Sequence, residues 1–456
     1  MSIKLYNTLT RQTEEFKPIK KGKVGLYTCG PTVYNFAHIG NFRAYIFGDI
    51  LKRALIYNNL DVNHIMNITD VDDKTIRESK ATNTSLHEFT THYIEEFEKD
   101  SESLNILPPT KYARAVEHID KMVSLIEKLI KKGYAYKSND GSVYFNVHKD
   151  KKYGQLSTIA LSQKRENAAG RIQADEYDKD NADDFALWKA WDETDGDVFW
   201  ETSLGKGRPG WHIECSAMSM EYLGASFDIH TGGVDLIFPH HENEIAQSEC
   251  ATGKKFVKYW LHNEWVMVEG KKMSKSVGNY VTLRTIVERG FNPIAYRFLL
   301  LQTRYRQQVN FTWEALQAAQ NGLDNIKNQI ANLGDAFKFS PKINNDFQEK
   351  FLEKINDDLN TPQALAVLQE VLKSDLHSND KYETIMDFDR VLGLGLNKIK
   401  RHGKLIIPSE IDELKNQRDT ARAEKNWSKS DDLRKQIEAL GYIVEDTADG
   451  TKVSKK

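Results

Sequence analysis

The chain of 456 residues has little cysteine, no marked excess of either charge and no long apolar run. An odd count of 3 cysteines excludes a disulfide scaffold, and reduced thiols indicate a cytoplasmic protein. Lysine and arginine number 63 against 66 aspartate and glutamate, so no chain-wide field favours nucleic acid or a membrane. No stretch approaches the roughly 18 apolar residues of a membrane helix, and the N-terminal segment lacks the apolar core of a signal peptide. We therefore expect a soluble, cytoplasmic protein that does not contact membranes and binds any polyanion through a local site.

Hydrophobic periodicity predicts that the first part of the chain alternates strands and helices. Residues 24–30 are a short apolar run that ends in Gly-Pro, and residues 41–59 have helical periodicity. The segment DVNHIMNITDVDD, residues 61–73, then predicts a second strand that runs into a capped helix. This order predicts a parallel sheet with crossover helices, so the expected fold class is α/β with a Rossmann-like domain.

The middle of the chain predicts an insertion in this domain. Residues 86–137 are mostly helical and residues 141–147 return to a strand, whereas residues 148–198 are polar and poorly periodic. Further strands are expected at 227–238 and 259–270, where the interrupted domain resumes.

The last third of the chain has a different pattern. From about residue 312 to residue 396, apolar positions recur at helical steps, as is typical of a helix bundle. Residues 411–425 and 428–440 predict two short helices, and Asp-Gly at 449–450 predicts a hairpin between two short strands. We therefore expect a helical bundle followed by a small C-terminal α/β module.

The stretch FPHHENEIAQSEC, residues 238–250, is rich in metal-binding side chains. In a helix that begins near its proline, His240 and Glu244 project from one face and both can reach a single ion. Cys29 and Cys215 are natural soft ligands to complete a zinc site. The alternative is a polar helix N-terminus whose histidines are only hydrogen-bonded.

Two further stretches, CGPTVYNFAHIGN at 29–41 and KMSKS at 272–276, predict a nucleotide site. At the expected helix start, unpaired amides, a close approach at Gly40 and a hydrogen bond from His38 suit a phosphate. The lysines of KMSKS supply mobile positive charge for a triphosphate. The alternatives are a helix cap for His38 and a solvated basic turn for KMSKS.

These motifs belong to a larger set of ordered stretches, which are CGPTVYNFAHIGN, NITDVDDK, GRPGWHIECSAM, FDIHTGGVDLIFPHHENEIAQSEC, KMSKS and the YRFLLL…YR region near 296–306. With them, nearly the whole chain resembles the class I aminoacyl-tRNA synthetases and, within these, the cysteinyl-tRNA synthetase family. The resemblance implies ATP-dependent ligation of L-cysteine to tRNA(Cys) through a cysteinyl-adenylate, with AMP and diphosphate as products.

The resemblance also implies a role for individual residues. It implies one zinc ion that receives the substrate thiolate and is held by Cys29, Cys215, His240 and Glu244. It places at the cysteine pocket Gly30, Thr69, Trp211 and His230. It assigns ATP binding, with Mg²⁺ accompanying the nucleotide, to His38, Gly40, Asn41, Lys272 and Lys275. The residues expected to act in catalysis are Lys275, His38 and Lys272.

One signature position departs from the family pattern, because Asn41 replaces the histidine that usually ends the motif. Its amide can donate to a phosphate oxygen but cannot carry charge. His241 is expected to support the metal site, and Cys250 to be an ordinary buried thiol. For Thr69 and Trp211 the alternatives are a helix N-cap and core packing.

The predicted domains follow from the same resemblance. They are a catalytic domain at 1–311, with the insertion at about 120–200 and a KMSKS and tRNA-stem-contact region at about 255–311, a helical bundle at 312–404 and an anticodon-binding module at 405–456. The expected tRNA contacts are Trp427, Arg418 and Arg422. Because acids are interleaved with the basic residues of this module, a solvated helix pair is the alternative. The expected partners are tRNA(Cys), L-cysteine and ATP, and the chain is expected to be a monomer.

Three other functions compete with this one. A cysteine ligase that acts on an amino sugar would share the adenylate chemistry but lack the C-terminal module. A zincin-type metallopeptidase would need a second histidine at the position of Ile245. A non-catalytic RNA-binding protein on a synthetase scaffold would tolerate a broken KMSKS or a missing zinc ligand, and neither is broken.

Overall fold

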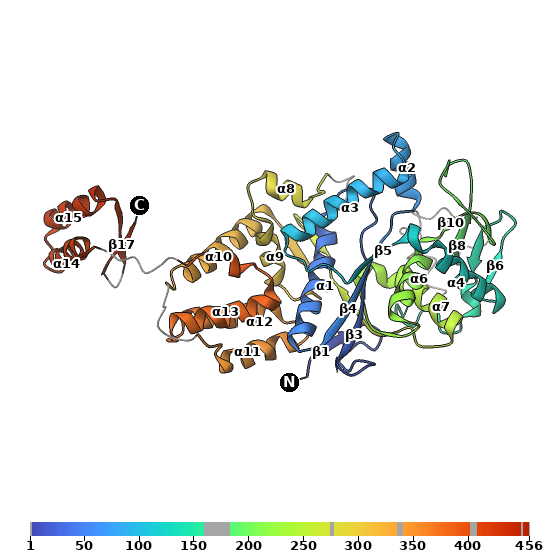
Figure 1. Ribbon diagram of the computed structural model, residues 1–456, viewed down its shortest axis with the longest axis horizontal. Helices are drawn as coiled ribbons and strands as arrows, with labels where there is room; N and C mark the ends of the chain where they lie inside the picture. The colour runs from blue at the N-terminus through green and yellow to red at the C-terminus, as the bar shows by residue number, and fades with distance from the viewer. Residues whose placement is uncertain are drawn as a thin grey trace.

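The computed structural model of the chain describes residues 2–158, 183–273, 278–334, 341–401, 408–447 and 450–455. A parallel sheet of five strands lies at its centre (Figure 1), in the order β12-β11-β3-β4-β5. Its strands are β3 (Lys23–Thr28), β4 (Asp61–Ile68), β5 (Lys111–Arg114), β11 (Phe227–Gly233) and β12 (Val257–Asn263). The predicted Rossmann-like α/β class is confirmed. Among the described residues, no helix is long and apolar enough to cross a membrane.

Helices from both parts of the chain cover the sheet. α1 (Ile39–Tyr57) follows β3 and carries an apolar face into one core cluster, which also includes side chains of the helical bundle. α4 (Ile119–Lys131), α6 (Trp211–Leu223) and α7 (Glu242–Thr252) contribute to a second core cluster together with the insertion. Two helices, α2 (Asp73–Ala81) and α3 (Leu86–Ser103), follow β4 and pack against each other. The polypeptide therefore crosses over between parallel strands through helices, as the sequence predicts.

The insertion forms a second sheet, of five antiparallel strands in the order β6-β7-β8-β10-β9. Its strands are β6 (Ala135–Lys137), β7 (Val143–Phe145), β8 (Phe185–Ala190), β9 (Trp200–Thr202) and β10 (Gly205–Pro209). The expectation of an irregular segment at 148–198 is therefore wrong for residues 185–190, although residues 159–182 lie outside the described part. The FALWKA run is short, but it pairs with β7 and β10 on its two sides, and its side chains Phe185, Leu187 and Trp188 are buried in the second core cluster.

Two other predicted elements differ from the structure. β5 lies inside the segment 86–137 that was expected to be mostly helical, because four residues at a sheet edge carry no distinctive periodicity. The strand predicted at 227–238 ends at Gly233, and the chain then enters helical turns, Val234–Leu236 and Ile237–His241. The apolar run VDLIF resembles a strand by composition, but it leads into α7.

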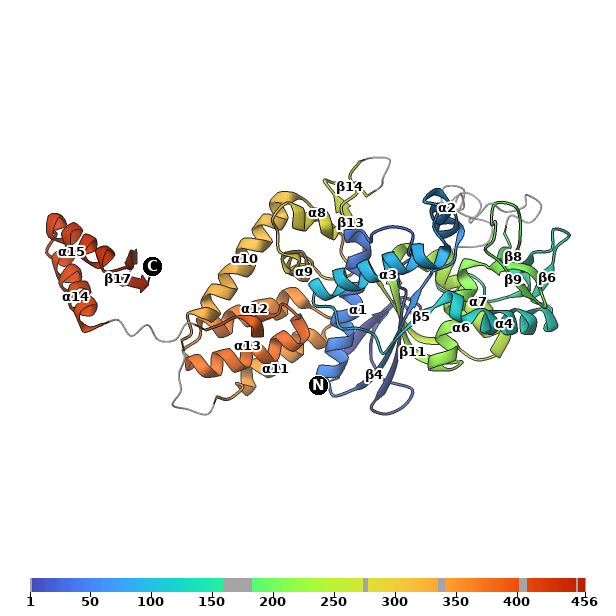
Figure 2. The ribbon, with the colours of Figure 1, turned by 45° about the horizontal axis from the view of Figure 1, so that its top comes forward.

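The helical part follows the parallel sheet in the chain and lies on the side away from the insertion (Figure 2). α8 (Leu283–Glu288) and α9 (Pro293–Leu301) precede four longer helices, α10 (Trp313–Ala331), α11 (Asn345–Asn356), α12 (Thr361–Lys373) and α13 (Ser378–Leu392). A small sheet joins β13 (Val266–Val268), β14 (Lys271–Lys272) and β15 (Val309–Phe311) in the order β14-β13-β15. A short hairpin, β1 (Lys4–Asn7) with β2 (Gln12–Glu15), begins the chain.

The C-terminal module has the expected helix pair and hairpin. α14 (Ser409–Ala423) packs on α15 (Trp427–Ala439), and β16 (Tyr442–Thr447) pairs with β17 (Gly450–Lys455). Its apolar core is small and is formed by Ile411, Ile437, Val444 and Val453. The predicted turn at 449–450 falls partly outside the described residues.

Candidate functional site

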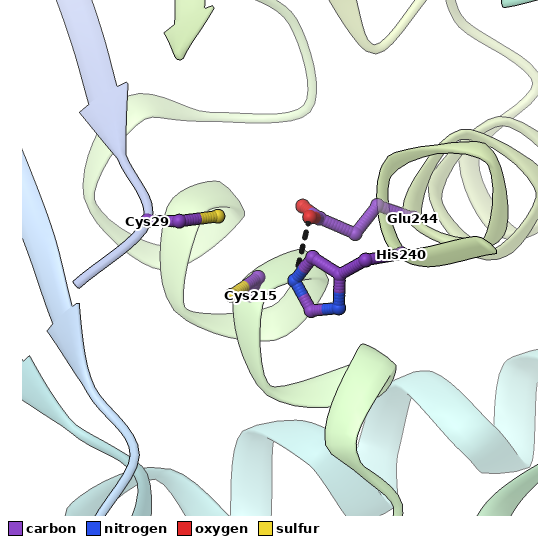
Figure 3. A group of neighbouring side chains, drawn as sticks. All are labelled: Cys29, Cys215, His240 and Glu244. Carbon is purple, nitrogen blue, oxygen red and sulfur yellow. Dashed lines mark ion pairs between the residues drawn. The ribbon is translucent and has the colours of Figure 1, made fainter. Parts of the chain in front are cut away.

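Four metal-binding side chains from three separate segments converge beside the carboxyl end of β3 (Figure 3). Cys29 directly follows this strand, Cys215 lies in α6, His240 lies in the turn before α7 and Glu244 lies in its first turn. Their ligand atoms all lie within 4.8 Å of one another, and Cys215, His240 and Glu244 are buried. The structure therefore brings together the four residues that the sequence proposes as metal ligands.

The chemistry of this cluster fits a divalent cation. Glu244 Oε1 is buried without a hydrogen-bond partner, although His240 Nε2 lies 3.1 Å away. Burial alone would lower the pKa of His240, but the neighbouring Cys215 and Glu244 raise it to about 10. The donors therefore favour a positive charge at their centre, and two sulfurs, an imidazole and a carboxylate match the preferences of zinc.

A second group of possible ligands overlaps the first and consists of Cys29, His230, His241 and Glu244. His230 Nε2 lies 3.0 Å from Glu244 Oε2, and both side chains are fully buried. His241 Nε2 lies 3.4 Å from Cys29 Sγ, while its Nδ1 lies 2.8 Å from His262 Nε2. His230 therefore contacts Glu244 and His241 contacts Cys29, so each of these histidines touches one of the predicted ligands.

Other side chains hold the ligands in place, and one of them, His212, was missed by sequence reasoning. The two Nδ1 atoms of His212 and His240 lie 2.9 Å apart, and the ring centre of Trp211 lies 4.3 Å from that of His240. Burial lowers the pKa of His212 well below its ordinary value, so this ring is neutral. Glu242 accepts backbone hydrogen bonds from Gly154 and Ser157 and so ties α7 to the insertion. The only sequence signal for His212 is its place beside Trp211 in GRPGWHIECSAM.

The residues expected at the cysteine pocket divide into two groups. Gly30 and Trp211 line the cleft described below, whereas Thr69 and His230 are buried, with 1% and 0% of their surface exposed. A side chain on Gly30 would lie 1.8 Å from the carbonyl oxygen of Asn67, so only glycine fits.

Thr69 is not a helix cap, because Asp72 caps α2. Its hydroxyl donates to Glu214 Oε2 at 2.9 Å, and this carboxyl is buried next to the cluster in α6. Burial raises the pKa of Glu214 well above its ordinary value. Thr69 therefore links the end of β4 to the helix that carries Cys215.

An open cleft with about 380 Å³ of water-accessible space connects the metal cluster to the nucleotide motifs. Its lining includes Cys29, Gly30 and Trp211 from the cluster side, and His38, Gly40, Asn41 and Lys272 from the motifs predicted to bind ATP. This single cleft brings together residues that lie far apart in the sequence.

His38 and Asn41 cap α1 reciprocally. His38 Nδ1 accepts from the Asn41 amide at 3.1 Å, and Asn41 Oδ1 accepts from the His38 amide at 3.1 Å. The neutral His38 ring therefore carries its proton on Nε2. The cap and the predicted nucleotide contact are compatible, because the cap uses only Nδ1 and Oδ1.

Tyr280 and Val281, which follow KMSKS in the chain, are anchored to the same helix start. The Ile39 amide donates to Val281 O at 3.0 Å, and the Tyr280 hydroxyl donates to Phe36 O at 3.0 Å. Lys272 lines the cleft with its Nζ 4.6 Å from the Trp265 ring centre. Lys275, the residue predicted to act on the phosphates, lies outside the described residues.

Two remaining predictions concern side chains away from the cleft. Cys250 is only partly buried and lies outside the metal cluster, and burial raises the pKa of its thiol to about 12. Arg418 is 1% exposed and pairs with Asp446 at 2.7 Å, so it supports the fold of the C-terminal module instead of presenting a charge to RNA. By contrast, Trp427 is 58% exposed, and Arg422 is partly exposed beside the same aspartate.

Comparison with solved structures finds the same fold in distant proteins. Methionyl-tRNA synthetase of Mycobacterium tuberculosis bound by methionyl-adenylate has a TM-score of 0.58 at 14% sequence identity, covering 83% of this chain and 93% of that one. A leucyl-tRNA synthetase of Agrobacterium radiobacter in a ternary complex has a TM-score of 0.54 at 12% identity, covering 84% and 85%. The family of class I (C) tRNA synthetase catalytic domains matches residues 15–321. The sheet, the cleft and this match define a class I aminoacyl-tRNA synthetase.

Sequence relatives narrow the class. Cysteine–tRNA ligase of Chlamydia felis is 46% identical over 469 residues, covering 100% of this chain and 98% of the relative. Cysteine–tRNA ligase of Brachyspira hyodysenteriae is 45% identical over 472 residues, covering 100% and 99%. A DALR domain matches residues 350–374, and the cysteinyl-tRNA ligase anticodon binding domain matches residues 407–453. The chain belongs to the cysteine–tRNA ligase family.

Proposed function

We propose that this enzyme ligates L-cysteine to tRNA(Cys) in two steps. The cysteine carboxylate attacks the α-phosphorus of ATP, which gives cysteinyl-adenylate and diphosphate. The terminal ribose hydroxyl of the tRNA then takes the cysteinyl group and releases AMP. The single observation that carries this proposal is the cleft that joins the predicted metal ligands to the predicted ATP-binding residues.

We propose that Cys29, Cys215, His240 and Glu244 hold one zinc ion, with His230 and His241 as supports. The bound ion supplies Lewis acidity that stabilises the thiolate form of the substrate side chain. The protein's part is to hold the four donors together, with Cys215, His240 and Glu244 buried, so that their charges and hydrogen bonds act with little competition from water. Gly30 and Trp211 form the neighbouring wall for the rest of the amino acid.

ATP binding rests on His38, Gly40, Asn41, Lys272 and Lys275. The His38 Nε2–H can donate to a phosphate oxygen while Nδ1 keeps the helix cap intact, and Gly40 leaves the backbone open to the nucleotide. We expect Lys272 and Lys275 to follow the phosphates as diphosphate leaves, with Mg²⁺ neutralising part of their charge. No protein nucleophile is needed, because positioning and electrostatic stabilisation carry the first step.

We assign anticodon recognition to the module at 405–456, with Trp427 and Arg422 as the contacts to RNA. A solvent-exposed indole can stack on an unpaired base, and a nearby guanidinium can pair with phosphate. The presence of this module favours tRNA over a small amino sugar as the acceptor. We propose further that the enzyme acts in the cytoplasm and as a monomer. Light scattering of the purified protein tests the monomeric state.

Cysteine-dependent exchange of radioactive diphosphate into ATP tests the first step, and charging of tRNA(Cys) tests the second. We expect both activities. Exchange without charging, together with cysteine transfer to an amino sugar, would contradict the assignment of the acceptor. A lack of exchange by the zinc-loaded protein would contradict the enzymatic function itself.

A further inference from the structure

The first turn of α2 places in the cleft a lysine to which the signature motifs assign no role. Lys74 is half-buried and lines the cleft, with its Nζ 5.3 Å from the centre of the Tyr34 ring, which also lines the cleft. Lys272 lines the same cleft but comes from β14. The described lining therefore contains two lysines from separate parts of the chain.

The carboxylates next to Lys74 in the sequence are engaged with other groups. Asp73 accepts from Lys189 Nζ at 2.8 Å and from the Arg208 guanidinium, and Asp72 accepts from the Thr75 amide at 2.7 Å. Among the described residues, no carboxylate forms an ion pair with Lys74 within 4.0 Å. An ammonium group held in a cleft without such a partner is suited to an anion of a substrate.

The position of Lys74 favours the tRNA over the triphosphate as the source of this anion. The Val33 amide donates to Thr69 O at 3.2 Å and the Thr69 amide donates to Pro31 O at 3.0 Å, so the segment that leads from Gly30 to Tyr34 lies beside the one that leads to Lys74. The reacting ribose must reach the cysteinyl carbonyl at this end of the cleft. An aromatic ring beside a cation is the usual arrangement for holding a single-stranded nucleotide, since the ring stacks on the base and the cation meets the phosphate.

We propose that Lys74 and Tyr34 bind the 3′-terminal nucleotide of the tRNA. The Lys74 ammonium contacts its phosphodiester, the Tyr34 ring stacks on its base, and together they direct the ribose hydroxyl toward the cysteinyl-adenylate. This assignment rests on the proposed function and adds a contact specific to its second step.

The decisive variants are Lys74→Ala and Lys74→Arg, with Arg77→Ala as the matched control. Arg77 lies on the same helix, is exposed and pairs with Glu78 at 2.9 Å, outside the cleft. We expect Lys74→Ala to slow single-turnover transfer from preformed cysteinyl-adenylate by about 10-fold or more, the usual effect of losing one contact to a charged group. Diphosphate exchange should stay within about twofold of the wild type, and Lys74→Arg should recover most of the transfer rate. Arg77→Ala should transfer at the wild-type rate.

The salt dependence of tRNA binding and the binding of a truncated tRNA identify the group that Lys74 contacts. Lys74→Ala should reduce the slope of log affinity against log salt by about 0.7, the change expected for one single-strand phosphate contact. With tRNA that lacks its 3′-terminal nucleotide, the wild type and Lys74→Ala should bind equally. Tyr34→Ala should weaken binding of the intact tRNA, whereas Tyr34→Phe should not.

Two outcomes would overturn the proposal. If Lys74→Ala lowers diphosphate exchange as much as transfer, the ammonium contacts ATP or the adenylate. If its binding defect persists with the truncated tRNA, the contact lies elsewhere on the RNA. A wild-type protein without diphosphate exchange would instead contradict the proposed function, so the two failures are distinguishable.

Discussion

Glu244 and Asp49 are both fully buried carboxylates of the catalytic domain, but their surroundings differ. Asp49 accepts from Arg297 at 2.6 Å, from Arg53 at 2.8 Å and from the Leu107 amide at 2.8 Å. Glu244 accepts from His230, but its Oε1 has no hydrogen-bond partner. Both oxygens of Asp49 are therefore hydrogen-bonded within the protein, whereas Glu244 Oε1 has only an ion pair, with His240 at 3.1 Å.

Their pKa values do not reveal this difference. Burial alone would raise the pKa of Glu244, but His230 and His240 lower it to about 2. Burial likewise opposes ionisation of Asp49, and Arg297 and Arg53 hold its pKa below its ordinary value. Both groups are anionic, so the distinguishing observation is geometric.

The comparison shows how to separate a structural cluster from a binding site. Arg297 also donates to Leu392 O at 2.8 Å and to Leu104 O at 3.2 Å, so the Asp49 cluster joins α1, α9 and the end of α13. The Asp49 carboxylate and the guanidinium groups of Arg53 and Arg297 all find hydrogen-bond partners within the protein. The Glu244 cluster contains sulfur and imidazole donors of the kind that hold zinc, and binding of a metal ion there displaces the proton that gives His240 its positive charge. The following predictions test this contrast, beginning with the largest effect.

Discrimination between cysteine and serine tests the Glu244 cluster most strongly. A thiol ionises far more readily than an alcohol. A site built to bind a polar group of its substrate can reject an analogue that lacks this group by about 10⁴-fold, because the analogue leaves the polar groups of the site without a partner. We expect activation of serine to be slower by about that factor in diphosphate exchange. Serine activation within about a hundredfold of cysteine, the range that an apolar pocket reaches, would show that the cluster does not select the substrate.

Arg297→Met tests the Asp49 cluster. It leaves the Asp49 carboxylate with one fewer buried cation, and removal of one partner from a buried pair typically costs about 3–5 kcal/mol. We expect a loss of this size in the free energy of unfolding, measured by urea titration, with an unchanged ratio of zinc to folded protein.

A surface pair is the control for this loss. Lys121 and Glu221 lie 2.9 Å apart with 53% and 37% of their side chains exposed, so Lys121→Met should cost less than about 1 kcal/mol. An equally small loss for Arg297→Met would mean that the buried cluster does not stabilise the fold.

Cys215→Ala is expected to weaken zinc binding more than about 100-fold, because loss of a ligand exceeds the effect of losing an outer partner. Elemental analysis and competition with a chelator measure this change, and cysteine affinity should fall with it. Cys250→Ala is the matched control, since Cys250 lies outside the cluster. Full zinc content in Cys215→Ala would favour the overlapping group that contains His230 and His241.

Removal of residues 405–456 should have the smallest effect on activation. The module has its own apolar core and none of its described residues lines the cleft, so we expect diphosphate exchange within about twofold of the full chain. Charging of tRNA should fall strongly. If exchange is lost together with charging in a folded protein, the module stabilises the catalytic domain, and the anticodon assignment loses its support.

Local sequence patterns were sufficient where the interacting residues are close in the chain. His240 and Glu244 lie one helical turn apart, and His38 and Asn41 form a reciprocal cap over three residues. The alternation of β3, α1 and β4 follows from side-chain periodicity for the same reason. Cys29 and Cys215 were proposed as soft ligands from their thiols alone, and the motif resemblance then assigned them to the site, although no local pattern connects them.

Only the tertiary structure shows which polar residues contact each other when they lie far apart in the sequence. The contacts of His212 with His240 and of Thr69 with Glu214 join segments separated by 28 and 145 residues. Arg418 is a basic residue of the kind that contacts RNA, but packing of the hairpin against α14 buries it against Asp446. Periodicity reports which face of an element is apolar, whereas the identity of a buried polar partner depends on how distant elements pack.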